Sequence, residues 1–338
     1  MKRANHLIDK IADTSNLELA FWKARKGKNG MPVVEQFRNN LYQNLPQLAE
    51  QIKSGFIVIG KSHKFTIYDP KKREICAASF PDRVLHHAMM SVCHPVFERY
   101  QIDDSYASRP GKGVYAAIQK AKLNQQSHQW FLKLDVRKHF ETIDHHILSN
   151  QLARLFKEDR LLHIFDQIIQ SYNTADGKGL PIGNLTSQYF ANHYLAVADH
   201  FIKEQLKVKS YVRYMDDMVL WDHNKNDLIE KGNALDSFFR NELQLQLKPF
   251  CLNHCKRGLP FLGYVIFPEK MHLNLRSRKR FRKKLFQYQT NLENEHWNEQ
   301  QYHKHILPLL AFAKKADTFH YRTKLLNYEH QNTNQERY

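Results

Sequence analysis

The sequence Tyr214-Met215-Asp216-Asp217 sets two adjacent carboxylates between two apolar runs, Tyr211-Val212 before it and Met218-Val219-Leu220-Trp221 after it. Apolar runs of this kind on both sides of a polar break predict a β-hairpin with the acids at its tip. Two like charges on one tight turn repel each other unless a cation neutralises them, so the hairpin predicts a divalent metal site. A solvated Asp-Asp turn is the alternative interpretation.

A third acid ends another strand-like run upstream. Asp135 closes the segment Trp130-Phe131-Leu132-Lys133-Leu134-Asp135. If it reaches the hairpin, Asp135, Asp216 and Asp217 are suited to bind two Mg²⁺ ions, with Mn²⁺ as a substitute, because hard divalent cations prefer carboxylate oxygens. Two such ions activate a 3′-hydroxyl and stabilise the departing pyrophosphate.

Composition narrows the class of protein. The chain has 338 residues and 42% hydrophobic content, enough for one elaborate domain or about two. Its 51 Lys+Arg against 34 Asp+Glu give a formal charge of +17, which predicts a polyanionic partner, nucleic acid being the simplest. No run approaches the roughly 18 apolar residues of a membrane-spanning helix, and the first residues lack the apolar centre of a signal peptide. We therefore expect no membrane partner and a cytoplasmic protein.

The cysteines Cys76, Cys93, Cys251 and Cys255 are too few and too scattered to predict a disulfide framework. Cys251, His254 and Cys255 lie close together in sequence and, with a distant fourth ligand, could hold zinc. The spacing lacks a second half-site, so small buried thiols beside a strand are the preferred interpretation.

The first part of the chain carries helix and hairpin signals. Ser15-Asn16-Leu17-Glu18 fits a capping box that opens a helix ending near Arg25. The β-rich runs Phe56-Ile57-Val58-Ile59-Gly60 and Phe65-Thr66-Ile67-Tyr68 flank a basic turn, and Lys71-Lys72-Arg73-Glu74-Ile75 follows. This pattern predicts a basic antiparallel fingertip.

Helical signals alternate with the acid-bearing strands. Apolar residues recur at helical spacing from Asp82 to Arg99, and the segments 146–172 and 187–206 also have helical character. The alternation predicts an α+β fold with helices on one face of a sheet.

The end of the chain is rich in positive charge. It predicts a helical tail after Phe267 that opens with seven basic residues and no acid: Arg276, Arg278, Lys279, Arg280, Arg282, Lys283 and Lys284. A solvated helix face is one interpretation; we prefer a terminal subdomain that follows a phosphate backbone.

Five sequence blocks resemble reverse transcriptases, and they occur in the order of that family over roughly residues 53–267. They are Ser105-Tyr106 through Arg109-Pro110-Gly111, Asp135 through Phe140, Gly179-Leu180-Pro181-Ile182-Gly183-Asn184-Leu185-Thr186-Ser187-Gln188, Tyr214 to Asp217, and Gly258-Leu259-Pro260-Phe261-Leu262-Gly263-Tyr264. The resemblance implies a right-hand polymerase with fingers, a palm with an antiparallel sheet and a helical thumb. It implies an N-terminal segment and fingers over 1–129, a palm over 130–270 with a fingers insertion around 150–185, and a thumb over 271–338.

The resemblance also implies roles for single residues. Asp135, Asp216 and Asp217 match the metal-binding catalytic carboxylates, and Lys248 the proton donor to pyrophosphate. Phe140 matches the steric gate that excludes a ribose 2′-hydroxyl, with core packing as the alternative. Arg73, or Lys72 in its place, matches the side chain that contacts the incoming triphosphate. The nucleotide pocket is completed by Ile182, Gly183, Gln188, Tyr214 and Met215, whereas the primer grip and other nucleic-acid contacts correspond to Leu262, Gly263, Tyr264 and Arg109.

Within that family the chain is similar to the bacterial enzymes of diversity-generating retroelements, in the lineage of group II intron and retron enzymes. It has their Tyr-Met-Asp-Asp core and Gly-Asn-Leu-Thr-Ser-Gln block, although Tyr189 follows Gln188 where many relatives have Trp. Retron enzymes usually have Ala before the paired aspartates. Ile182 stands where accurate relatives have Gln, and an aliphatic side chain cannot hydrogen-bond near the dNTP sugar, so we expect weaker discrimination against mismatches.

The retroelement resemblance implies a complete activity and its partners. The enzyme would copy a template-repeat RNA into cDNA with errors at template adenines, as in mutagenic retrohoming. Its partners would be template RNA, cDNA, dNTPs and a small basic helical accessory protein, the accessory variability determinant, in a ribonucleoprotein. A defence-associated or retron-like bacterial reverse transcriptase is the alternative, and a non-catalytic RNA-binding protein of polymerase fold is a third hypothesis.

Overall fold

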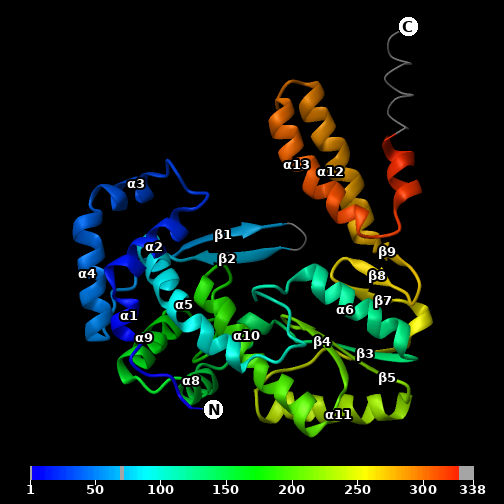
Figure 1. The fold of residues 1–338 in the computed structure, drawn as a ribbon, viewed down its shortest axis with the longest axis horizontal. Helices are drawn as coiled ribbons and strands as arrows, with labels where there is room; N and C mark the ends of the chain where they lie inside the picture. The colour runs from blue at the N-terminus through cyan, green and yellow to red at the C-terminus, as the bar shows by residue number, and fades with distance from the viewer. Residues whose placement is uncertain (1, 69–71, 327–338) are drawn as a thin grey trace. The chain divides into compact units, whose positions relative to one another are not determined.

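A computed structural model describes residues 2–68 and 72–326, shown in Figure 1. Lys71 of the predicted fingertip and residues 327–338 of the predicted thumb lie outside the described residues. The chain forms two compact units, one from residues 1–113, 134–218 and 230–250, the other from 114–133, 219–229 and 251–338. The predicted division into fingers, palm and thumb stays a prediction.

The first unit begins with helices. They are α1 (Ile8–Ile11), α2 (Thr14–Arg25), α3 (Pro32–Asn39), α4 (Leu41–Ser54) and α5 (Phe80–Tyr100). The helix predicted to end at Arg25 is confirmed, but its N-cap is Asp13 and not Ser15. The Asp13 carboxylate accepts hydrogen bonds from the backbone N–H groups of Ser15 and Asn16, which the first turn would otherwise leave unpaired.

The fingertip hairpin forms, with one strand displaced from the prediction. Strand β1 (His63–Ile67) pairs antiparallel with β2 (Arg73–Ala77). The prediction that residues 56–60 form a strand was wrong. Backbone N–H groups of this segment donate to side chains: Ile57 to Gln167 Oε1, Val58 to Gln51 Oε1, and Gly60 to the Asp82 carboxylate. Because side chains satisfy these donors, the β-prone sequence needs no strand partner.

The predicted central helices are confirmed. The segment predicted over 146–172 forms two helices, α8 (His145–Leu155) and α9 (Asp159–Gln170), and the segment over 187–206 forms α10 (Leu185–His200), which continues as a π-helical turn over Phe201–Gln205. The short helix α7 (His139–Thr142) was not predicted. Helix α10 is buried along most of its length, although Gln188 is exposed. Helix α11 (Lys225–Asn241) follows the central strands.

The acid-bearing strands belong to one sheet. Strands β3 (Trp130–Asp135), β4 (Ser210–Tyr214), β5 (Asp217–Asp222) and β6 (Cys251–His254) lie in the order β4-β5-β3-β6. Strands β3 and β6 pair antiparallel, with Trp130 opposite His254. The hairpin prediction is confirmed, because only Met215 and Asp216 separate β4 from β5.

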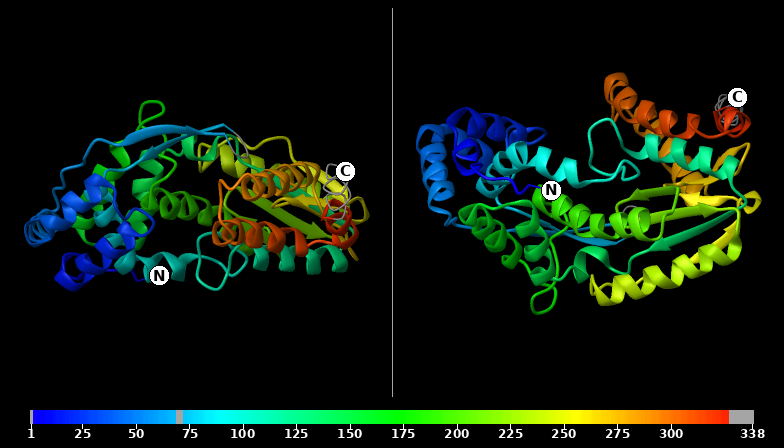
Figure 2. Two further views of the ribbon diagram at one scale, coloured as in Figure 1. Left: turned by 90° about the horizontal axis from the view of Figure 1, so that it is seen from above. Right: turned by 60° about the horizontal axis from the view of Figure 1, so that its bottom comes forward.

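The second unit contains a helix, a small sheet and the basic segment of the chain. After α6 (Val114–Ser127) and a 3₁₀ turn at Cys255–Arg257, strands β7 (Leu259–Phe261), β8 (Tyr264–Ile266) and β9 (Met271–Leu273) form an antiparallel sheet. Helices α12 (Leu275–Glu293) and α13 (Glu299–Lys314) then lie side by side, as Figures 1 and 2 show. Helices with antiparallel sheets give the predicted α+β class.

Two further expectations concern membranes and thiols. Within residues 2–68 and 72–326, no helix is both long enough and apolar enough to cross a bilayer. Cys255 is buried, as predicted, whereas the prediction of a buried thiol was wrong for Cys251, which is exposed.

Candidate active site

The turn between β4 and β5 holds its acids in an unfavourable electrostatic environment. Met215 adopts a left-handed backbone conformation with φ 54°, which makes the tight connection from Tyr214 to Asp217. Burial raises the pKa of the Asp216 carboxyl above its ordinary value, and the charges of Asp217 and Asp135 raise it further. The charges of Asp217 and Asp135 thus both act on Asp216, and a bound cation would relieve this repulsion. The assignment of the three acids to one metal site stays a prediction.

Lys248 is fixed beside Asp135 by the backbone. Val136 and Leu247 form an antiparallel bridge, and the backbone N–H of Lys248 donates to the carbonyl oxygen of Asp135 at 2.8 Å. The Lys248 Nζ atom then lies 2.7 Å from Asp135 Oδ2. The other carboxylate oxygen, Asp135 Oδ1, is buried and has no hydrogen-bond partner in the part of the chain that the structure describes.

The acids of the turn and of β3 supply the type of oxygen donor that a hard divalent cation prefers. Buried carboxylate oxygens without a full set of donors are the ligands that Mg²⁺ and Mn²⁺ prefer. Among the described residues, no three His, Cys, Asp or Glu side chains are gathered closely enough to be a metal-binding cluster. Asp135 is instead paired with Lys248, so one cation, the Lys248 ammonium, already neutralises part of the acidic site.

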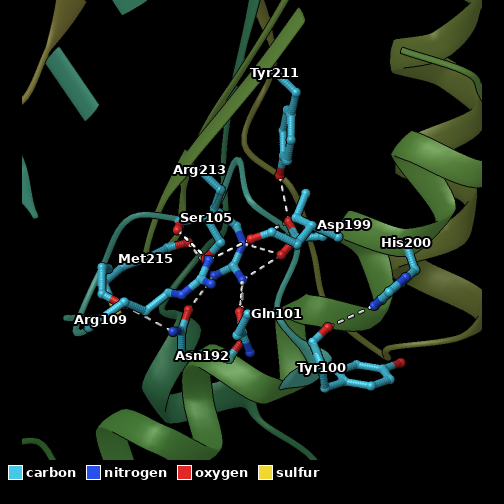
Figure 3. Close-up of polar contacts among 12 residues, drawn as sticks. Tyr100, Gln101, Ser105, Arg109, Asn192, Asp199, His200, Tyr211, Arg213 and Met215 are labelled. Atoms are coloured by element: carbon cyan, nitrogen blue, oxygen red, sulfur yellow. Dashed lines mark hydrogen bonds and ion pairs between the residues drawn. The ribbon is translucent and has the colours of Figure 1, made fainter. Parts of the chain in front are cut away.

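An ion pair below the acidic turn was missed by the sequence analysis. Arg213 in β4 and Asp199 in α10 are both fully buried, and their side chains pair at 2.6 Å (Figure 3). The hydroxyl of Tyr211 donates to the same carboxylate at 2.8 Å. Two buried charges are tolerated because each satisfies the other, and additional hydrogen bonds use their remaining donors and acceptors.

The same guanidinium also reaches the turn. Arg213 Nη1 donates to the side-chain oxygen of Asn192 at 2.6 Å and to the carbonyl oxygen of Met215 at 3.3 Å, and Nη2 donates to Gln101 at 3.2 Å. A lone Arg inside an apolar strand and a lone acid near the end of an apolar helix are the sequence signals that could have predicted this pair.

Three segments predicted to bind the nucleotide are adjacent in the first unit. The backbone N–H of Leu180 donates to the carbonyl oxygen of Phe140 at 2.7 Å, and Cys76 N–H donates to the carbonyl oxygen of Ile182 at 2.9 Å. At Gly183, with φ 122°, an added Cβ would lie 2.8 Å from Ile75 Cγ2. A side chain at this position would therefore clash with the Ile75 side chain of β2, and the positive φ also favours glycine.

The predicted triphosphate ligands start strand β2. Lys72 and Arg73 are both exposed. Arg73 and Ile75 point to the same face of the strand because side chains alternate along it, and Ile75 contacts the Gly183 backbone position. Gln188 and Tyr214 are exposed and half-buried, respectively. Phe140 is also half-buried, so its ring is not fully committed to core packing.

Arg109 has a different environment from the one predicted. Its guanidinium forms an ion pair with Glu98 at 2.7 Å and donates to the carbonyl oxygens of Ile102 and Ser105. Its side chain is only 8% exposed. The predicted nucleic-acid contact of Arg109 has no support in this arrangement, because protein acceptors already use its donors.

In the second unit, the predicted primer-grip turn lies between β7 and β8. Leu262 and Gly263 both have positive φ, 46° and 93°. A Cβ at Gly263 would lie 3.1 Å from Ser277 Oγ and from the Phe312 ring. The hydroxyl of Tyr264 donates to the carbonyl oxygen of Phe312 at 2.8 Å. The turn is thus held against the start of α12 and the end of α13.

The predicted basic segment forms the first half of α12. Most of its charged side chains are exposed, and Lys284 is half-exposed. The exposed members are Arg276, Arg278, Lys279, Arg280, Arg282 and Lys283. A helix carrying this charge is suited to contact phosphates.

The chain is similar to several known proteins. Among curated proteins, the chain is 24% identical over 154 residues to Protein YkfC of Escherichia coli (strain K12), covering 41% of this chain and 40% of that protein. It is 24% identical over 145 residues to the group II intron-encoded protein LtrA of Lactococcus lactis subsp. cremoris, covering 41% of this chain and 24% of that protein. The chain thus spans less than half of either relative. A solved structure of telomerase from Candida albicans with a fragment of telomeric RNA matches with a TM-score of 0.49 and 15% identity, covering 71% of this chain and 52% of that one.

The family model described as "Reverse transcriptase (RNA-dependent DNA polymerase)" matches residues 62–266, which include all three acids, the residue 179–188 block and the Gly263 turn. The helices and antiparallel sheets described above are consistent with the right-hand polymerase fold that the sequence predicts for such a protein. This chain belongs to the reverse transcriptase family.

Proposed function

We propose that this chain is an RNA-directed DNA polymerase that adds dNTPs to a primer by nucleotidyl transfer assisted by two divalent metal ions. The observation that carries the proposal is the electrostatic coupling of Asp216 to Asp217 and Asp135 in a family member. A site that buries one carboxylate beside two others favours cation binding. Membership in the family supports the reaction type.

Asp135, Asp216 and Asp217 would hold the metal ions. When bound, Mg²⁺ or Mn²⁺ would supply Lewis-acid activation of the primer hydroxyl and neutralise charge on the leaving pyrophosphate. Lys248 lies beside Asp135, a position from which its ammonium could donate a proton to pyrophosphate. Phe140, Ile182 and Gly183 would shape the pocket for the sugar and base, and the exposed side chains of Lys72 and Arg73 would contact the triphosphate.

For the finer function we propose error-prone copying of a template-repeat RNA for a diversity-generating retroelement. Ile182 supports this, because its carbonyl is fixed on β2 and its side chain offers no hydrogen bond to an incoming nucleotide. The accessory protein expected of such systems would join template RNA, cDNA and this chain in a ribonucleoprotein. Defence-associated and retron-like reverse transcriptases remain the alternative.

The test uses purified protein, a primed RNA template, Mg²⁺ and labelled dNTPs. We expect incorporation by the wild type and a loss of about a thousandfold or more in Asp216→Asn, because transition-state charge stabilisation worth several kcal/mol disappears. RNA affinity of the variant should stay near that of the wild type. Incorporation by Asp216→Asn at the wild-type rate would reject the catalytic assignment, whereas RNA binding without any incorporation by the wild type would favour the non-catalytic hypothesis.

A further inference from the structure

Helix α12 presents basic residues on two opposite faces. Leu275, Lys279, Arg282 and Phe286 recur at intervals of three and four residues, which places them on one face. Ser277, Arg280, Lys284 and Tyr288 do the same two residues later. At 3.6 residues per turn the two sets lie roughly half a turn apart. The helix therefore has positive charge on two opposite surfaces. A ligand bound to one of these surfaces cannot contact the other.

Each face borders a groove within the second unit. The Tyr321 groove has a volume of about 480 Å³ and is lined by Leu275, Arg278, Lys279, Arg282, Phe286, Tyr321, Lys324 and Leu325. The Phe312 groove has a volume of about 320 Å³ and is lined by Ser277, Arg280, Lys284, Tyr288, Lys304 and Phe312. Both volumes are typical of sites for small ligands or single nucleotides and too small to enclose a duplex.

The Phe312 groove adjoins the predicted primer grip. Ser277 and Phe312, which line this groove, are the two residues that approach the Gly263 turn within 3.1 Å of an added Cβ. If that turn holds the primer end of the proposed polymerase, as the family resemblance implies, the primer–template duplex would contact the Phe312 groove. The opposite face of α12 is then left for another ligand.

The Tyr321 groove combines cations with aromatic surfaces. Its lining has four cations, Arg278, Lys279, Arg282 and Lys324, and no carboxylate among the lining residues, all of which are described. The Arg278 guanidinium lies 4.6 Å from the Tyr321 ring centroid, and Arg282 lies 5.5 Å from that of Phe286. The Tyr321 hydroxyl donates to the carbonyl oxygen of Arg278 at 3.1 Å, which fixes the ring against the helix.

This chemistry favours an unpaired strand over a duplex. Unpaired bases expose their faces and stack on aromatic rings and guanidinium planes while lysines contact the phosphates, whereas a duplex hides those faces. We propose that the Tyr321 groove is a second nucleic-acid site, which binds an unpaired segment of RNA while the Phe312 groove contacts the primer–template duplex. The proposal rests on the proposed function for the identity of the duplex.

The sequence provides three matched pairs of substitutions, each replacing one Lys and one Arg of α12 by Glu. Lys279→Glu with Arg282→Glu alters the Tyr321 groove. Arg280→Glu with Lys284→Glu alters the Phe312 groove. Arg276→Glu with Lys283→Glu changes no residue that lines either groove. This control pair measures how much RNA affinity is lost through the change in net charge alone. Circular dichroism melting of each full-length variant establishes that it folds.

The measurement is fluorescence anisotropy of a short labelled unpaired RNA, with saturating unlabelled primer–template duplex and no dNTP. Duplex affinity is measured separately with the label on the duplex. We expect the Tyr321-groove pair to weaken binding of unpaired RNA about tenfold more than the control pair does, with a loss of duplex affinity no larger than the control's. The Phe312-groove pair should show the reverse preference.

Equal losses of unpaired RNA in the Tyr321-groove pair and the control pair would overturn the proposal, because charge alone would then explain binding. Complete displacement of unpaired RNA by the duplex would also overturn the proposal. So would a wild type that does not bind unpaired RNA, because the groove would then be filled by another segment or partner. Incorporation of dNTPs on a primed template is assayed in parallel with wild type. If the wild type incorporates dNTPs but the Tyr321-groove pair and the control pair lose the same affinity for unpaired RNA, only the second site is rejected. If the wild type does not incorporate dNTPs, the proposed function is rejected.

Discussion

Arg213 donates a hydrogen bond from Nη1 to the carbonyl oxygen of Met215, two residues later, at 3.3 Å (Figure 3). Met215 is the residue whose left-handed backbone makes the acidic turn, and Arg213 is itself held by the buried Asp199 carboxylate. The turn that bears Asp216 is therefore held by the buried guanidinium of Arg213. This relationship makes Arg213 a positioning residue in the proposed polymerase.

Breaking this buried pair should cost stability. Arg213→Met leaves the Asp199 charge buried without its partner, and we expect a loss of about 3–5 kcal/mol in the free energy of unfolding. Chemical denaturation measures it. An apolar replacement, Arg213→Met with Asp199→Leu and Tyr211→Phe, removes both buried charges and the hydroxyl together. It should recover part of that loss but not all of it, because Asn192 and Gln101 still lose the donor that Arg213 supplies.

The apolar cluster variant separates positioning from stability. This variant folds but lacks the guanidinium that donates to the Met215 carbonyl oxygen. We expect its kcat for dNTP incorporation to fall about tenfold or more with little change in KM for the dNTP, because the missing hydrogen bond affects the alignment of the reacting groups. Steady-state kinetics on a primed template gives both constants. Recovery of kcat together with stability would show that Arg213 has only a structural role.

Lys248 competes with metal for Asp135. The ion pair is partly exposed, with the Lys248 side chain 45% accessible, so its contribution is at most about 1 kcal/mol. Removing it in Lys248→Ala should increase affinity for Mn²⁺, followed by electron paramagnetic resonance, by about two- to fivefold. Lys248→Arg is the control that keeps the charge. If affinity of Lys248→Ala falls or stays unchanged, the ammonium does not compete for the site.

Ile182 should determine error frequency. We expect Ile182→Gln to reduce misincorporation opposite template adenine about tenfold, because an amide can hydrogen-bond near the nucleotide sugar and penalise a misplaced pair by about 1.4 kcal/mol. Sequencing of cDNA made by each protein measures the error spectrum. Ile182→Leu, equal in volume and equally apolar, is the matched control. Indistinguishable spectra of Ile182→Gln and wild type would reject this account of position 182.

His139 should make the region next to Phe140 sensitive to acid. Burial lowers the pKa of His139 to about 4, and its Nε2 group interacts with the carbonyl oxygen of Ala191 at 3.2 Å. The unfolded chain takes up a proton near pH 6.5, which the folded chain resists until about pH 4. Stability is therefore lost as the pH falls through this window, by up to about 3 kcal/mol.

The matched variant for that prediction is His139→Gln, which keeps a donor for the Ala191 carbonyl and does not titrate. Urea denaturation at pH 7, 6, 5 and about 4 should show a shallower loss of stability for the variant than for wild type. A wild-type and a variant curve with the same slope would mean that other groups, such as the buried His86 or His193, cause the acid sensitivity.

Local sequence determined much of the candidate site. The hairpin at Asp216, the strand ending at Asp135 and the long helices follow from periodicity and from polar breaks between apolar runs, because these are short-range properties of the chain. The order of the five blocks was enough to predict the family, which the family model then confirmed over residues 62–266. By contrast, residues 56–60 have strand propensity but form no strand, because distant side chains take their backbone donors.

Tertiary structure alone decided which charges are paired. Arg109 was predicted to contact nucleic acid, yet it pairs with Glu98 of α5, and Arg213 in β4 pairs with Asp199 of α10. The same holds for α12, whose basic run reads as one patch but is divided between two grooves by the 3.6-residue period and by the packing of α13 and Tyr321. Ion pairing and groove formation depend on contacts between residues far apart in the chain, and a linear pattern does not specify those contacts.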